Sequence, residues 1–195
     1  MASIFRRKRG TAKQSQDPVQ LTERSADKEG FNFELLSKKT VADCVSAMMK
    51  AMPQARWNRE ELSRGLLAPN TLTLIARFEG IIVGVISGTV LKTLIPPPTI
   101  RLMAVLDQRS GDKGLGGYLI TAFLKETRRR IPNAPYVDVA LPSSERTSIA
   151  LYSLMGFDIN GFVKDGFMLS FAGAERQDLV LLRRSYTPAT SPNVV

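Results

Sequence analysis

Residues 102–119 place an apolar run, a polar stretch and a glycine-rich turn in one order: LMAVL, DQRSGDK and GLGGYL. This order predicts a strand, a loop and a helix whose first turn is largely glycine. A helix start presents unpaired backbone N–H groups and partial positive charge, and glycine lets a ligand approach these donors closely. The segment therefore predicts an anion site suited to phosphate.

A second segment, Ser148–Phe157, predicts an amphipathic helix that carries Tyr152 and stops at Gly156. Residues 136–141 predict a strand between the two segments. Each feature also has a purely structural interpretation. A Gly-x-Gly before a helix is common, a tyrosine on such a helix is usually a core residue, and Gly-Phe is an ordinary helix stop.

Taken together, the segments resemble the GNAT superfamily of acetyl-coenzyme A-dependent N-acetyltransferases. In that family a loop of the form Arg/Gln-x-x-Gly-x-Gly/Ala holds the coenzyme A pyrophosphate, and a later helix carries a tyrosine shortly before Gly-Phe. Gly114 and Gly116 take the glycine places here, and Tyr152 with Gly156-Phe157 takes the later ones. The resemblance spans residues 31–185 and is carried by residues 99–157.

Two positions depart from the family pattern. Gly111 stands where the loop's basic residue is expected, and Glu145 stands where an asparagine often opens the later helix. Arg109 and Lys113 are candidates to supply the missing positive charge. These departures leave open whether catalysis is retained.

The resemblance implies an α/β (α+β) fold, with a mixed, mostly antiparallel sheet of about seven strands and helices on both faces. The expected domain is residues 31–185, between a basic tail at residues 1–30, disordered or partner-bound, and a C-terminal tail at residues 186–195. Hydrophobic periodicity predicts strands at 31–36, 71–78, 81–91, 99–106, 136–141, 157–162 and 178–184, and helices from 40, at 58–67, at 114–130 and around Tyr152. Ser143 or Ser144 is expected to cap the last helix, and residues 163–177 are expected to be irregular.

The resemblance also implies a coenzyme site between the strands that begin at residues 99 and 136. The backbone groups of Val105 and Leu106 would pair with the pantetheine arm, and the amides of 113–117 would take the pyrophosphate. We expect Gly116→Glu to weaken coenzyme binding. The implied coenzyme-binding residues are Val105, Leu106, Arg109, Lys113, Gly114, Leu115, Gly116 and Gly117.

Tyr152 is the candidate general acid, because a phenol with a pKa of about 10 donates a proton without being ionised at neutral pH. Asp107 and Glu145 are candidate bases acting through water, and Asp138 is a further carboxylate that could face the cleft. For each, an ordinary surface carboxylate is the alternative.

Acceptor recognition is expected at the joint of the first two helices and at residues 163–177. The joint contains Arg56 and Trp57, and Trp57 is equally well explained as a packing anchor. We expect no metal site.

The composition narrows the chemistry further. The chain has no histidine, which excludes Ser-His and Cys-His nucleophile pairs, a histidine base and most zinc sites. Its single cysteine, Cys44, excludes an internal disulfide and fits a reducing, cytoplasmic compartment. No apolar run is long enough to span a bilayer.

The net charge of +9 suits a phosphate-bearing cofactor, and the run Arg6–Arg9 is a candidate contact for an acidic protein or nucleic acid. Three functions stay open: an N-acetyltransferase that uses acetyl-CoA and a primary amine of a small molecule or protein; a catalytically silent module in an assembly; and a regulator that binds an acyl-coenzyme A. A homo-oligomer through an exposed strand edge is also possible.

Overall fold

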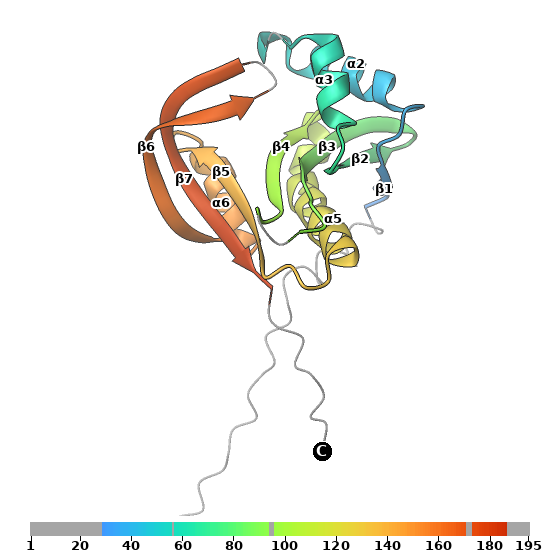
Figure 1. The fold of residues 1–195 in the computed structure, drawn as a ribbon. Helices are drawn as coiled ribbons and strands as arrows, with labels where there is room; N and C mark the ends of the chain where they lie inside the picture. Colours follow the sequence, from blue (N-terminus) through green and yellow to red (C-terminus); the bar gives the residue numbers. More distant parts are fainter. Residues whose placement is uncertain (1–28, 56, 94–95, 171–172, 187–195) are drawn as a thin grey trace, which may run out of the picture.

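The computed structural model describes residues 29–55, 57–93, 96–170 and 173–186, and these form a seven-stranded sheet covered by helices on both faces (Figure 1). The strand order is β1-β2-β3-β4-β5-β7-β6, and every neighbouring pair is antiparallel except β4 and β5. The predicted fold class is confirmed. The basic run Arg6–Arg9 lies outside the described residues.

Most predicted elements form within a few residues of their expected bounds. The strands are β1 (Asn32–Leu35), β2 (Thr71–Phe78), β3 (Ile81–Thr89), β4 (Thr99–Val105), β5 (Tyr136–Pro142), β6 (Asp158–Ser170) and β7 (Gly173–Ser185). The helices are α2 (Val41–Ala51), the short 3-10 turn Pro53–Ala55, α3 (Arg59–Leu66), α4 (Gln108–Asp112), α5 (Leu115–Arg130) and α6 (Arg146–Leu154).

Local sequence signals explain several of these boundaries. Asn58 caps α3, because its Oδ1 accepts hydrogen bonds from the amides of Glu60 and Glu61 at 2.9 and 3.1 Å. Glu79 and Gly80 both have positive φ, 50° and 82°, so the β2–β3 turn takes the left-handed backbone that a two-residue hairpin favours.

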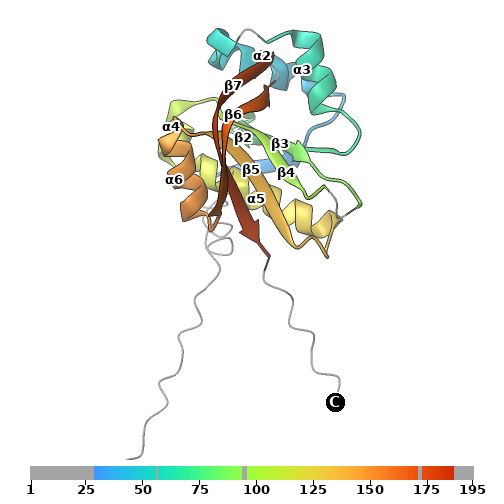
Figure 2. The same cartoon turned by 60° about the vertical axis from the view of Figure 1, so that its left-hand side comes forward.

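The helices divide between the two faces of the sheet (Figure 2). On one face α2 and α3 bury a cluster that includes Cys44, Met48 and Leu62. On the other face α5 and α6 bury the larger cluster, which includes Phe123, Tyr152 and Phe157. Burial raises the pKa of the Cys44 thiol to about 12, so Cys44 acts here as an unreactive apolar residue.

Three local predictions were wrong. A short helix, α4, forms in the expected loop because Asp107 caps it. Neither Ser143 nor Ser144 caps α6, since the N-cap position is Glu145 and no side chain caps the backbone there. Residues 163–177 mostly extend the β6–β7 ribbon, in which Asp165 (φ 50°) lies at a bulge between registered pairs.

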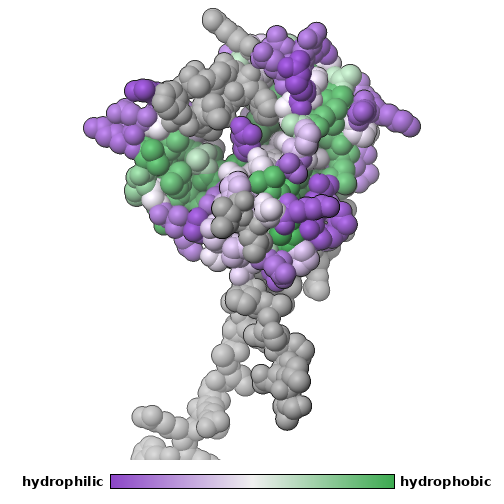
Figure 3. Space-filling view, viewed as in Figure 1, coloured by the Kyte–Doolittle hydropathy of each residue, from purple (hydrophilic) through white to green (hydrophobic). Residues whose placement is uncertain are grey.

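β6 is the outer strand of the sheet and presents apolar side chains to solvent. Ile159 and Phe162 of β6 and Leu154 of α6 are exposed, and Figure 3 shows apolar surface on the side of the molecule that β6 forms. Such an edge is where another strand could pair, so the predicted homo-oligomer stays a prediction. Among the described residues, no helix is both long and apolar enough to cross a membrane.

Candidate functional site

Strand β4 is held along one edge and open along the other. It pairs with β3 from Thr99 to Val105, but with β5 at only two registered pairs, Thr99↔Asp138 and Ile100↔Val139. Beyond Ile100 the strands β4 and β5 no longer pair, although β5 continues to pair with β7 as far as Pro142. The sheet therefore opens at the carboxyl ends of two parallel strands, where ligands bind in many open α/β sheets (Figure 1).

The pairing with β3 determines which backbone groups face this opening. Leu106 donates its amide to the Val83 carbonyl at 2.8 Å, so Gly84↔Val105 is a non-hydrogen-bonded pair. The N–H and C=O of Val105 therefore point away from β3 and toward the opening. The same alternation directs the backbone of Met103 there.

These directions refine the predicted contacts. Val105 offers its backbone to the opening as predicted, whereas the Leu106 amide is already used inside the sheet. The sequence analysis did not identify Met103 as a backbone partner. Its orientation depends on a β-bulge, and no residue type in this strand indicates one. Ser87 pairs with Leu102 and Gly88 pairs with Ile100, which leaves Arg101 as the extra residue.

The glycine turn lies at the carboxyl end of β4, as predicted. Gly114 has φ 80°, in the left-handed region, and its carbonyl accepts the amides of Gly117 at 3.0 Å and Tyr118 at 3.4 Å. The amides of Leu115 and Gly116, at the first two helical positions of α5, have no intrahelical acceptor. They are the donors that an anion at this helix start would meet.

Close packing also requires glycine at position 116. A Cβ at Gly116 would lie 2.9 Å from Cδ2 of Leu151 on α6, closer than side chains normally approach. Gly116→Glu would therefore push the Leu151 side chain aside as well as crowd the turn, so a loss of coenzyme binding in that variant would not isolate close approach. A Cβ at Gly117 would lie 3.4 Å from Sδ of Met155, the C-cap residue of α6.

Tyr152 lies on α6 with its hydroxyl directed at β4. The residue is 1% exposed, packs edge-on against the Phe157 ring, and donates to Met103 Sδ at 4.0 Å. Burial raises the pKa of the phenol above its usual value, so the hydroxyl stays protonated at neutral pH. A thioether sulfur is a weak acceptor, which leaves this buried hydroxyl available to a better one.

The two candidate bases occupy helix ends. Asp107 accepts hydrogen bonds from the Ser110 amide at 2.9 Å and the Ser110 hydroxyl at 2.8 Å, and these hold the pKa of its carboxyl below the usual range. Asp107 is therefore a capping residue that binds protons poorly. Glu145 is exposed and accepts from Ser148 Oγ at 3.3 Å.

The two cations of the loop turn toward the β2–β3 hairpin. Lys113 Nζ lies 3.7 Å from Glu29 Oε2 and 4.6 Å from the centroid of the Phe78 ring. Arg109 is exposed at the start of α4 and forms no ion pair with any residue in the described ranges. Both residues shortly precede the glycine turn in the sequence.

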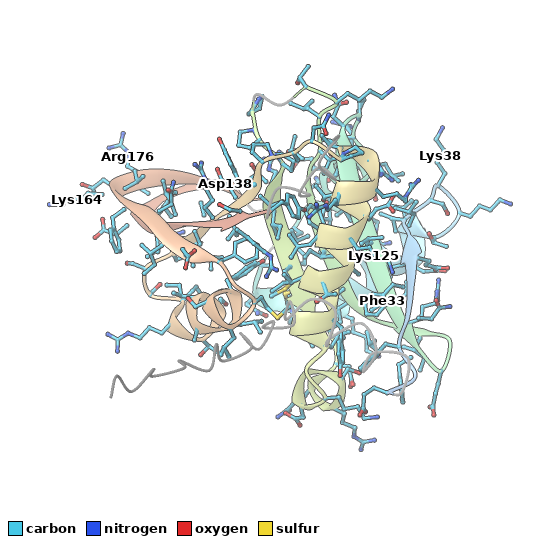
Figure 4. All side chains as sticks on the ribbon, turned by 90° about the horizontal axis from the view of Figure 1, so that it is seen from below. Phe33, Lys38, Lys125, Asp138, Lys164 and Arg176 are labelled. Carbon is cyan, nitrogen blue, oxygen red and sulfur yellow. The ribbon has the colours of Figure 1, made fainter. Side chains whose placement is uncertain are left out.

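Asp138 is committed to β7 rather than to the opening. Its two carboxylate oxygens accept from Arg183 Nε at 2.7 Å and Nη2 at 2.8 Å, and the guanidinium lies 3.5 Å from the centroid of the Tyr136 ring. Figure 4 shows Asp138 on the inner part of this half of the sheet, while Lys164 and Arg176 lie at the far end of the β6–β7 ribbon.

The helix joint contributes packing. Trp57 is half-buried against the α2–α3 cluster, which agrees with its interpretation as a packing anchor. Arg56 lies outside the described residues. The structure therefore brings together Val105, the glycine turn and Tyr152. Asp138 is instead bound to Arg183, and Trp57 packs in the α2–α3 cluster.

Comparisons with known proteins agree on the fold. No protein-family model matches the sequence, and no curated protein sequence matches it. Among solved structures, the ribosomal-protein-S18-alanine N-acetyltransferase of Escherichia coli superposes with a TM-score of 0.64 at 17% identity, over 85% of this chain and 99% of that one. A GNAT family acetyltransferase from Elizabethkingia anophelis with acetyl-CoA bound gives a TM-score of 0.61 at 15% identity, over 81% and 99%.

A probable acetyltransferase from Staphylococcus epidermidis is similar to the same degree, with a TM-score of 0.64 at 15% identity over 80% of this chain and 99% of that one. At such identities the likeness concerns the fold. Sheet order, the opening between β4 and β5, and these superpositions lead to one conclusion: the chain has the fold of the GNAT acetyltransferases.

Proposed function

We propose that this protein is an N-acetyltransferase that transfers an acetyl group from acetyl-CoA to a primary amine of a small molecule or protein. The observation that carries the proposal is the one-sided pairing of β4, which leaves the backbone of Met103 and Val105 facing the opening beside a glycine turn. The likeness in fold to acetyltransferases, one with acetyl-CoA bound, supports the same assignment.

The pantetheine arm of coenzyme A contains two amide groups, so it can hydrogen-bond an open strand edge as another strand would. Met103 and Val105 would supply the backbone partners. The amides of Leu115 and Gly116, with the partial positive charge of α5 behind them, would receive the pyrophosphate. The chain thus offers separate partners for the neutral arm and for the charged end of the coenzyme.

In the proposed reaction the amine nitrogen attacks the thioester carbonyl carbon, and the carbon–sulfur bond breaks. The leaving sulfur takes the Tyr152 proton, and the amine nitrogen loses a proton to water. Since the pKa of Tyr152 is raised, its hydroxyl carries a proton at neutral pH and can act as acid but not as base. Of the candidate bases, Glu145 is exposed and would act through water, whereas Asp107 is engaged in capping.

A second candidate is a catalytically silent binding module. The absence of a basic residue at Gly111, the capping role of Asp107 and the basic run Arg6–Arg9 favour it. In that case the open edge would hold a partner segment or would serve no ligand, and the basic tail would contact nucleic acid or an acidic protein.

Calorimetric titration of the full chain with acetyl-CoA, followed by release of free thiol in the presence of a panel of amines, tests the proposal. Saturable binding at micromolar strength with amine-dependent thiol release supports the enzyme. Binding without thiol release would support an acyl-coenzyme A sensor. No binding would reject both and leave the silent module.

A further inference from the structure

A cavity of about 710 Å³ lies beside the β4–α4 turn. Its walls come from α2, from the β2–β3 hairpin and from residues 106–113. None of its lining residues belongs to β5 or α6, but it shares Leu106, Asp107, Arg109 and Lys113 with the loop of the site described above. A volume of 300–1,000 Å³ is typical of small-molecule sites, so the cavity can hold a ligand of roughly that class.

The inner wall of the cavity is apolar. Ile82 and Val83 of β3 are buried there, Leu106 and Phe78 are half-buried, and Ile81 stands exposed beside them. Ile81 is 68% exposed, although it follows a tight turn where a polar residue would cost nothing. The wall is therefore suited to the hydrocarbon part of a ligand.

The polar groups of the cavity carry an excess of positive charge. Lys50, Arg109 and Lys113 line it together with Glu79 and Asp107. The Asp107 carboxylate accepts two hydrogen bonds from Ser110, and Lys113 forms an ion pair with Glu29. Lys50 and Arg109 make no ion pair within the described part of the chain, although the charge of the Asp107 carboxylate acts on Arg109. The three cations and two carboxylates of the lining therefore leave a net charge of +1.

We propose that this cavity binds an amphipathic anion: a carboxylate, sulfonate or phosphate head held by Lys50 and Arg109 with a hydrocarbon or aromatic body against Ile82 and Leu106. The head would lie between Lys50 on α2 and Arg109 on α4, two exposed residues that both line the cavity. The proposed site uses neither the open edge of β4 nor Tyr152, and it shares Arg109 with the expected coenzyme-binding residues.

Octanoate is a suitable probe, and amide chemical-shift mapping on the full chain locates its binding directly. We expect saturable shifts in residues 47–51, 78–83 and 106–113. The uncharged analogue 1-octanol should bind about fivefold or more weakly, the effect of losing one half-exposed charge contact. Saturable shifts confined to the β4–β5 opening, or none around the cavity, would overturn the proposal.

Two variants sharpen the test. Lys50→Met and Arg109→Met each remove a charge at the cavity, and Lys92→Met removes one exposed lysine at a distant surface with the same change in net charge. Octanoate affinity should fall about fivefold in each cavity variant and stay unchanged in the control. Equal weakening in all three would mean that only the overall positive field attracts octanoate, and would reject the site.

Discussion

The two edges of strand β4 differ in what they are paired with, although they belong to the same seven residues. The edge toward β3 is closed by a ladder that reaches Val105, and the edge toward β5 is closed only at Thr99 and Ile100. The closed edge fixes the direction of every backbone group on the open one. A rigid binding edge is therefore obtained by pairing a strand fully on one side and leaving the other side unpaired.

The largest expected effect comes from the tyrosine beside the open edge. Tyr152→Phe removes the proposed acid, and we expect turnover to fall about 10²–10⁴-fold with little change in acetyl-CoA affinity. Stability should change little, because the lost hydroxyl donates only to the sulfur of Met103. Thiol-release kinetics and calorimetry measure the two quantities.

Tyr186→Phe is the matched control, because Tyr186 is a second tyrosine whose pKa is raised by burial. Its hydroxyl donates to the Leu124 carbonyl at 3.0 Å, away from the opening. This variant should lose about 1 kcal/mol of unfolding free energy and keep full turnover. Unchanged turnover in Tyr152→Phe would show that Tyr152 is a core residue and not the general acid.

A pair of proline substitutions separates the two edges of β4. In Ala104→Pro the lost N–H belongs to the β3 ladder, and we expect a loss of about 3 kcal/mol of unfolding free energy. In Val105→Pro the lost N–H faces the opening, so the loss of stability should be smaller while acetyl-CoA affinity falls about tenfold. Denaturant unfolding and calorimetry on both variants give the comparison, and equal destabilisation would contradict the assigned directions.

A smaller, pH-dependent effect is expected in α5, where the Glu126 carboxylate accepts hydrogen bonds from Arg129 and Arg130 at 2.7 and 2.9 Å. These contacts lower the pKa of Glu126 from 4.5 to about 2. The stabilisation by these contacts is therefore complete above pH 4.5, the pKa of Glu126 in the unfolded chain. It is lost as the pH falls from about 4.5 to about 2.

Glu126→Gln should thus lower the unfolding free energy by about 1 kcal/mol or less at pH 7, since the arginines are partly exposed, and by nothing near pH 2. Urea unfolding at several pH values measures the difference between the two proteins. A difference that does not vary with pH would show that packing, not charge, is responsible.

The smallest expected effect concerns the contact between Glu29 and Lys113. Glu29→Gln releases a lysine next to the glycine turn, so acetyl-CoA should bind about two- to threefold more tightly at low salt. The gain should vanish as salt is raised, because both side chains are about two-fifths exposed. A gain that is independent of salt would indicate a change in loop structure instead.

Sequence periodicity was sufficient for most of the sheet and helices because their apolar patterns are strong and local. It failed at the β6–β7 ribbon, where the glycine and polar residues of 163–177 suggested a loop and tertiary pairing formed strands. It also failed at α4, because Asp107 and Ser110 cap a helix too short to show a period.

For the candidate site, the sequence identified the glycine turn and Tyr152 but not the geometry that relates them. Contacts such as Glu29 with Lys113 and Gly116 with Leu151 join residues far apart in the chain, and no local pattern indicates them. The commitment of Asp138 to Arg183 is of the same kind. The side of β4 that Met103 faces depends on the extra residue Arg101.

Because Arg101 is one extra residue in β4, it changes the face of the sheet to which the residues after it point. Ile100 packs toward α5 while Leu102 packs toward α2, although residues two apart in a regular strand share a face. Deleting Arg101 would restore the regular alternation and exchange, over the rest of the strand, the residues that face α5 for those that face α2. In homologues with an insertion or deletion at this position, we therefore expect the two faces and the two edges of β4 to be exchanged together.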